Sequence, residues 1–199
     1  MEASQRKQDI LNYSKELFSQ KGYYNTQISD IIKNARIARG TIYQYFKNKD
    51  DIFITLLKNF YEDWLKQLTL DNKSIDLKTI DPKDYFRHRV KTTLTFLAND
   101  QHLCNIVLRI GIGLQGDLGV VINRFEEKIN NIVVNDLLLG IKAGNVKKDI
   151  DVELVASLIS GSLLYTSYHY FVFKNENKKE NEIISLSEKI LSTYENIFY

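Results

Sequence analysis

Residues 26–49 read TQISDIIKNARIARGTIYQYFKNK, and this stretch decides the fold. Isoleucines recur at helical spacing up to Ala35, and Ile42 and Phe46 form a second short apolar stripe after a turn at Arg36-Ile37. We therefore expect helices at 27–34 and 38–46, joined as a helix-turn-helix. The second helix carries exposed hydrogen-bonding side chains, and such a helix fits the major groove of duplex DNA.

The neighbouring segments extend this motif into a small helical domain. An amphipathic stripe predicts a helix at 5–21, which ends where Gly22 can adopt the left-handed conformation. Thr26 is expected to cap the next helix through its hydroxyl, and Asn48 to cap a fourth helix at 48–69. We expect a DNA-binding domain at 1–50, with the fourth helix as its connector.

The remaining sequence, residues 51–199, predicts a larger helical domain. Pro82 is the single proline, strand-like alternation is scarce, and residues 70–81 are rich in turn formers. Asp81 and Asp151 are expected to cap helices. The fold class is therefore all-α, with about nine helices in total. Those of the larger domain are expected at 82–99, 101–112, 118–142, 152–174 and 180–197.

Charge and composition narrow the class of protein. Residues 1–50 hold nine Lys or Arg and five Asp or Glu, a net +4, whereas the rest of the chain is at −2. A basic first quarter is typical of a module that meets phosphates, and also of a solvated helix face. One cysteine excludes a disulfide framework and a structural zinc site. Without a signal peptide or a long apolar segment, we expect a cytoplasmic protein outside the membrane.

The first 55 positions contain a set of residues at characteristic spacings: Leu17-Phe18, Gly22-Tyr23, Thr26, Ile28-Ser29-Asp30-Ile31 and the run 40–49. It resembles the DNA-binding domain of the TetR family of bacterial transcriptional regulators. The rest of the chain is similar to the family in helix count and order. The resemblance implies a homodimer, usually a repressor, that binds a palindromic operator. In the family, a small molecule bound by the C-terminal domain lowers the affinity for the operator.

Two positions depart from the family pattern, which often has glycine and serine there. Arg36 must form the turn without the conformational freedom of glycine, and its charge can reach a phosphate instead. Ala38 cannot cap the recognition helix with a hydroxyl. The fold prediction is unaffected, but the operator sequence cannot be transferred from relatives.

We expect the DNA contacts to come from the helix-turn-helix and its flanks. The start of the second helix can hold a phosphate, and Gly40 allows a close approach. Arg39 is expected to recognise a base or a phosphate, since its guanidinium can bond two acceptors of guanine. Threonine and glutamine would contact base edges, while the tyrosines and Lys49 would contact the DNA backbone. The full set is Thr26, Gln27, Arg36, Arg39, Gly40, Thr41, Tyr43, Gln44, Tyr45 and Lys49. The alternative for each is a solvated polar residue.

The larger domain offers candidates for an effector site and a dimer interface. Aromatic residues and one isolated arginine predict a site for an apolar or aromatic small molecule, at Phe86, Phe96, Arg109, Tyr165, Tyr168 and His169. Ordinary core packing is the alternative for the rings, and a solvent-facing or ion-paired side chain for the arginine. Broad apolar faces on the last two helices predict dimerisation through Leu158, Leu163, Ile184 and Leu191, with intrachain core as the alternative.

Catalysis has little support in the sequence. His102 and Cys104 are two residues apart and would point to different sides of a helix, and no third ligand has a recognisable spacing. No phosphate-binding glycine loop or serine elbow occurs, so no cofactor is implied. Two alternatives stay open: a ligand-independent architectural DNA-binding protein, and a helical carrier or enzyme that retains the motif.

Overall fold

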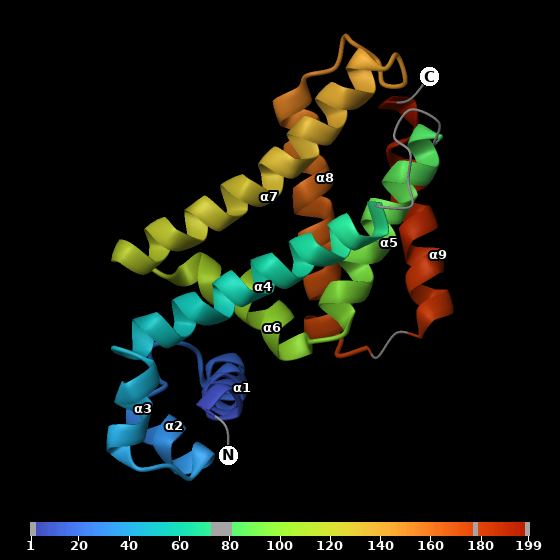
Figure 1. The fold of residues 1–199 in the computed structure, drawn as a ribbon. Helices are drawn as coiled ribbons and strands as arrows, with labels where there is room; N and C mark the ends of the chain where they lie inside the picture. Colours follow the sequence, from blue (N-terminus) through green and yellow to red (C-terminus); the bar gives the residue numbers. More distant parts are fainter. Residues whose placement is uncertain (1–2, 73–80, 177–178, 198–199) are drawn as a thin grey trace. The chain divides into compact units, whose positions relative to one another are not determined.

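A computed structural model describes residues 3–72, 81–176 and 179–197, and its secondary-structure elements are all helices (Figure 1). The α-helices are α1 (Ala3–Lys21), α2 (Ile28–Ala35), α3 (Arg39–Tyr45), α4 (Lys49–Asn72), α5 (Pro82–Ala98), α6 (Gln101–Asn105), α7 (Gly116–Lys142), α8 (Val152–Ser167) and α9 (Glu180–Thr193). Two π-helical turns, η1 (Ile106–Ile110) and η3 (Tyr168–Phe173), and two 3-10 turns, η2 (Gly111–Gly113) and η4 (Glu195–Ile197), complete the described part. The prediction of an all-α fold is confirmed.

Three predicted N-caps are present and explain where their helices begin. The side chains of Asp81, Asp151 and Asn48 each accept a hydrogen bond from a backbone amide two or three residues further on, at 2.8–3.1 Å. These bonds satisfy amides that have no partner within the first turn of a helix. The sequence therefore located the starts of α4, α5 and α8 correctly.

The irregular helical turns were not predicted. The expected helix at 101–112 consists of α6 followed by η1 and η2, and the one at 152–174 consists of α8 followed by η3. A single π turn shifts the helical period too little to disturb an apolar pattern read from sequence. Helix α4 extends to Asn72, three residues beyond its expected end, and residues 73–80 of the predicted connection lie outside the described residues.

The chain packs as two compact units. The first unit comprises Met1–Glu62 and His102–Ile122, and the second comprises Asp63–Gln101 and Asn123–Tyr199. This division differs from a single boundary after residue 50, because most of α6 and both η1 and η2 belong to the same unit as α1, α2 and α3, and η1 packs on α1. The side-chain amide of Asn105 donates to the backbone carbonyl of Ser19, at 2.9 Å, in the last turn of α1.

An aromatic cluster forms the centre of the first unit. Phe18 and Phe53 are fully buried, and their rings meet edge-to-face with centroids 5.3 Å apart. Tyr23 packs edge-on against Phe53 at 5.1 Å. These side chains join α1, the link after it and α4. Helix α2 packs on α1, so the cluster fixes the helix on which the helix-turn-helix rests.

The second unit is built around α5, which packs against α8 and α9. Val90, Leu94 and Phe171 are completely buried there. The indole N–H of Trp64 donates to the hydroxyl of Thr93 at 3.3 Å, and so joins α4 to α5. Within the described residues, no helix is long and apolar enough to cross a membrane.

Candidate nucleic-acid interface

The turn between α2 and α3 is held by a residue in the left-handed conformation. Arg36 follows α2 with φ 51° and ψ 47°, and its backbone N–H bonds back to the carbonyls of Ile32 and Lys33. This is the conformation that glycine adopts without strain. Arg36 forms this turn at a positive φ, as expected, and its side chain is exposed.

Replacing Arg36 with glycine should stabilise the protein. Because a left-handed conformation strains a residue that has a Cβ, Arg36→Gly is expected to raise the free energy of unfolding by about 0.5–1 kcal/mol. Urea denaturation measures this. Lys33→Gly is the matched control, since Lys33 is an exposed basic residue inside α2, and it should lower stability by about 1 kcal/mol. A loss of stability in both variants would contradict the strain at Arg36.

Helix α3 presents one polar face to solvent and one apolar face to the core. Ile42 and Phe46 are 1% and 3% exposed and anchor the helix. Arg39, Gly40, Tyr43 and Gln44 lie on the opposite side and are exposed, and we call these four residues the recognition face. Thr41 and Tyr45 are half-buried beside it. Ala38 precedes the helix without a side-chain cap, as expected.

Gly40 is not required by the packing of the chain. A Cβ added at Gly40 would meet no atom within 4 Å, and the residue lies inside α3 rather than in a left-handed turn. Glycine in a helix lowers stability relative to alanine. Its presence on the recognition face therefore favours close approach of a ligand.

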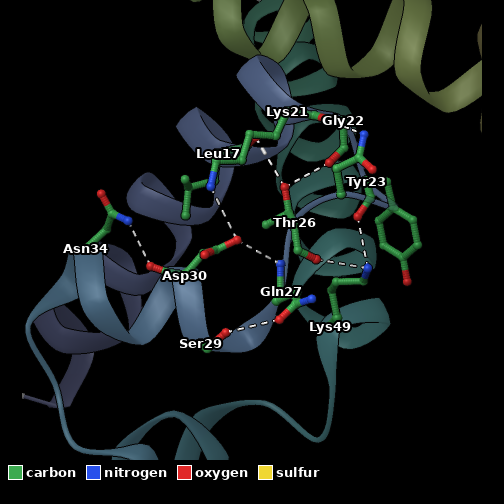
Figure 2. A network of polar contacts seen from close by, with 11 residues as sticks. Leu17, Lys21, Gly22, Tyr23, Thr26, Gln27, Ser29, Asp30, Asn34 and Lys49 are labelled. Carbon is green, nitrogen blue, oxygen red and sulfur yellow. Dashed lines mark hydrogen bonds and ion pairs between the residues drawn. The ribbon is translucent and has the colours of Figure 1, made fainter.

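The start of α2 differs from the prediction at Thr26. The N-cap is Gln27, whose backbone amide donates to the carboxylate of Asp30 at 3.2 Å (Figure 2). The hydroxyl of Thr26 points inward instead and donates to the carbonyls of Leu17 and Gly22, at 3.3 and 2.8 Å. Because Thr26 is 0% exposed, a phosphate contact through its hydroxyl is ruled out, and Gln27 keeps the exposed position.

The carboxylate of Asp30 is held in its charged form at the same helix end. The backbone amide of Gln27 is the main cause of a lowered pKa at Asp30, and Lys21, at 3.4 Å, acts in the same direction. An acid here also suits the positive end of the helix. The positive partial charge at the start of α2 is therefore already neutralised in part by the carboxylate of Asp30.

Lys49 fastens the start of α4 to the link between α1 and α2. Its ammonium donates to the carbonyls of Tyr23 and Thr26, at 2.9 and 3.0 Å, and lies 4.2 Å from the centre of the Tyr23 ring (Figure 2). Burial lowers the pKa of Lys49, and burial together with a hydrogen bond to Asp50 raises that of Tyr23. An ammonium has three donors, so one remains for a phosphate.

The residues predicted for an effector site do not form one cluster. Tyr165, Tyr168 and His169 lie together at the end of α8, where the Tyr165 and His169 rings stack at 6.3 Å. Tyr165 is 69% exposed, and Phe86 packs on the ring of Tyr194, the residue after α9, at 6.1 Å. Phe96 is half-buried on α5, whereas Arg109 is exposed and belongs to the first unit. Each of these residues stays a prediction.

One polar cluster of the second unit was missed. Arg89 on α5 bonds to Asp136 on α7 and to the hydroxyl of Tyr85, with all three side chains largely out of solvent. A signal was present in the sequence, since Asp136 is the single charged residue between Ile129 and Ile141. A lone charge within an apolar helix needs a partner.

The four predicted dimer residues differ in how far they are exposed. Leu163 and Leu191 are 8% and 3% exposed and belong to the core of a single chain, so they cannot form an interface. Ile184 is half-buried. Leu158 is 53% exposed and lies in an exposed stripe of α8, made of Leu154, Leu158, Gly161 and Tyr165. We call this set the α8 stripe, and exposed apolar patches of this kind mark interaction sites.

Comparisons with known proteins agree with this geometry. The sequence pattern described as "Bacterial regulatory proteins, tetR family" matches residues 10–56. The fatty acid metabolism regulator protein of Bacillus subtilis (strain 168) is 29% identical over 183 residues, covering 92% of this chain and 90% of that protein.

Two solved structures have the same fold over nearly the whole chain. The transcriptional regulator FadR from Bacillus subtilis, solved in complex with stearoyl-CoA, is 28% identical with a TM-score of 0.79, covering 93% of this chain and 95% of that one. The fatty acid degradation regulator FadR from Bacillus halodurans is 22% identical with a TM-score of 0.81, covering 94% of each chain, and shows the fold alone.

Proposed function

The chain belongs to the TetR family of bacterial regulatory proteins, and from this we propose that it is a cytoplasmic, dimeric repressor released from its operator by a long-chain acyl-CoA. The observation that carries the proposal is the recognition face of α3, held on a buried apolar side and presented by the left-handed turn at Arg36. We assign the chain no catalytic step.

The effector class rests on similarity and on the chemistry of the second unit. A regulator 28% identical to this chain over most of its length was solved with stearoyl-CoA. Apolar helices suit a long alkyl chain, since each buried methylene contributes about 0.8 kcal/mol. Affinity should therefore rise with acyl length until the site is full.

Release from DNA requires the two recognition faces of a dimer to lose their spacing. They must lie about 34–36 Å apart to enter successive major grooves of a palindromic operator. The chain passes from one unit to the other within α4, after the first residue of α6 and within α7. A coupling free energy of about 1–3 kcal/mol along these connections is enough for derepression.

Fluorescence anisotropy with DNA from upstream of the protein's own gene tests the proposal. We expect specific binding that stearoyl-CoA reverses and that CoA alone does not. Binding that ignores sequence and depends steeply on salt would favour an architectural protein instead. Turnover of a small molecule that persists when operator binding is lost would favour an enzyme or carrier.

The α8 stripe is proposed as the dimer interface. A carboxylate at its centre would be buried against the partner without a counter-charge, so Leu158→Glu should weaken dimerisation at least about 100-fold. Size-exclusion chromatography with light scattering should then find a monomer. Val120→Glu is the matched control, because Val120 is equally exposed, at 50%, but lies on α7. If Leu158→Glu stays dimeric, the interface lies elsewhere.

A further inference from the structure

A charged cluster lies inside the second unit, between α5 and α7. The guanidinium of Arg89 lies 3.1 Å from one carboxylate oxygen of Asp136 and donates to the other at 3.2 Å. Arg89 also donates to the hydroxyl of Tyr85 at 2.8 Å, and that hydroxyl donates to Asp136 at 2.9 Å. The side chains of Arg89 and Asp136 are only 16% and 22% exposed.

The other basic residues near Arg89 on α5 are placed differently. Arg87 and Lys91 pair with Glu188 and Glu180 of α9, and their side chains are 38% and 40% exposed. Such exposed ion pairs contribute little to stability. Arg89, by contrast, has a largely buried side chain, and burial disfavours its positive charge.

A buried ion pair is weak evidence for a role in stability, because removing two charges from water costs about as much as their attraction returns. The surroundings of Asp136 hold no other charge on α7 from Ile129 to Ile141, and α8, which packs on α5, has Glu153 as its single charged residue. The acids of α9 are Glu180, Glu182 and Glu188, and its only cation is Lys189. The cluster is thus a neutral pair set apart from the exposed ion pairs of α5 and α9, with His88 beside it on α5, and that arrangement fits a ligand site.

The protonation of the cluster depends on its pairing. Burial raises the pKa of Asp136, while the guanidinium of Arg89 and the hydroxyl of Tyr85 act to lower it. Burial also raises the pKa of Tyr85 to about 12, so the phenol stays neutral. If Arg89 turned to another anion, the largest influence that keeps Asp136 charged would be lost.

We propose that Arg89 binds an anionic group of the effector and that Asp136, its counter-ion in the free protein, takes up a proton from solvent when this happens. The site stays neutral in both states: the pair of guanidinium and carboxylate is exchanged for a guanidinium paired with the ligand and a protonated Asp136. This inference rests on the proposed effector class and adds where the anionic group binds. It requires effector affinity to rise as pH falls.

The anionic oxygens could belong to a fatty-acid carboxylate or to the phosphates of an acyl-CoA. Titration calorimetry with stearate, stearoyl-CoA and CoA distinguishes these sources. Each is titrated at constant pH in buffers of different ionisation enthalpy, which reports the number of protons taken up on binding. The expected result is uptake approaching one proton per site for the ligand that reaches Arg89. Between the pKa of Asp136 in the free protein and its higher pKa in the complex, the affinity should fall by up to tenfold per pH unit as the pH rises.

Asp136→Asn gives the decisive result. The amide cannot take up a proton and does not hold Arg89 by charge, so the variant should bind the effector more tightly at pH 8 and without linked proton uptake. A residue with only a structural role would not increase affinity when it is replaced. Ionisation of the ligand's own phosphate is common to all variants, so the difference between wild type and variant isolates Asp136.

Two further variants complete the test. Arg87→Gln, which breaks an exposed pair on the same helix, should change neither affinity nor proton uptake. The double variant Arg89→Gln/Asp136→Asn keeps the cluster neutral and should fold but bind the effector at least tenfold more weakly. Equal proton uptake in wild type and Asp136→Asn would overturn this inference but not the proposed effector class. If none of the three ligands binds the wild type, both the inference and the proposed effector class are wrong.

Discussion

Replacing Arg39 or Tyr43 with alanine is expected to abolish specific operator binding while the fold and the dimer persist. Arg39 is exposed at the first position of α3, and Tyr43 is 47% exposed one turn later. A guanidinium that bonds two acceptors of guanine contributes about 1–3 kcal/mol, and a dimer makes the contact twice. The loss at a palindromic site should therefore be about 2–6 kcal/mol.

Anisotropy titrations at several salt concentrations separate the roles of the two residues. A base contact should lower affinity for the operator more than affinity for random DNA, whereas a phosphate contact lowers both and reduces the salt dependence. Arg124→Ala is the charge-matched control, because Arg124 is exposed on α7 in the second unit. Unchanged operator affinity in both recognition-face variants would refute the assignment of α3 to DNA.

Phe53→Ala is expected to lower the free energy of unfolding by about 3–5 kcal/mol. Phe53 is 0% exposed, and its ring meets those of Phe18 and Tyr23 edge-on at 5.3 and 5.1 Å. Truncation removes the buried ring and leaves a cavity that its rigid neighbours cannot fill. Because α2 packs on α1, which carries Phe18, operator binding should be lost at a lower temperature than in the wild type.

Thermal and urea denaturation measure this change. Phe53→Leu keeps most of the side-chain volume and should lower the free energy of unfolding clearly less than Phe53→Ala does. Tyr13→Ala removes a ring that is 39% exposed on α1, and its effect should stay below about 1 kcal/mol. If all three variants lost the same stability, the aromatic cluster would not be the centre of the first unit.

The fold could be predicted from sequence wherever one residue satisfies a local requirement. Asp81, Asp151 and Asn48 cap helices because a short polar side chain reaches the free amides of its own first turn. Gly22 and Arg36 end α1 and α2 in the left-handed conformation, with φ of 80° and 51°. These features depend on neighbours within a few residues, and so the helix-turn-helix could be predicted from the sequence.

The predictions that failed concerned side chains whose partners are distant in sequence. Thr26 resembles an N-cap, yet its hydroxyl turns to the carbonyl of Leu17 in the preceding helix. Leu163 and Leu191 have the same apolar pattern as Leu158, but only packing separates the core from the exposed α8 stripe. Hydrophobic spacing identifies an apolar face without saying what covers it.

The sequence by itself determined an all-helical chain and the place of its helix-turn-helix, and it predicted which residues of the second helix contact DNA. Periodicity, caps and turn residues suffice for this because their energies are local. Only the tertiary structure joined α6 to the DNA-binding helices and Asp136 to Arg89, 47 residues away. Burial and long-range pairing depend on which helix faces pack together, and a linear pattern does not contain that information.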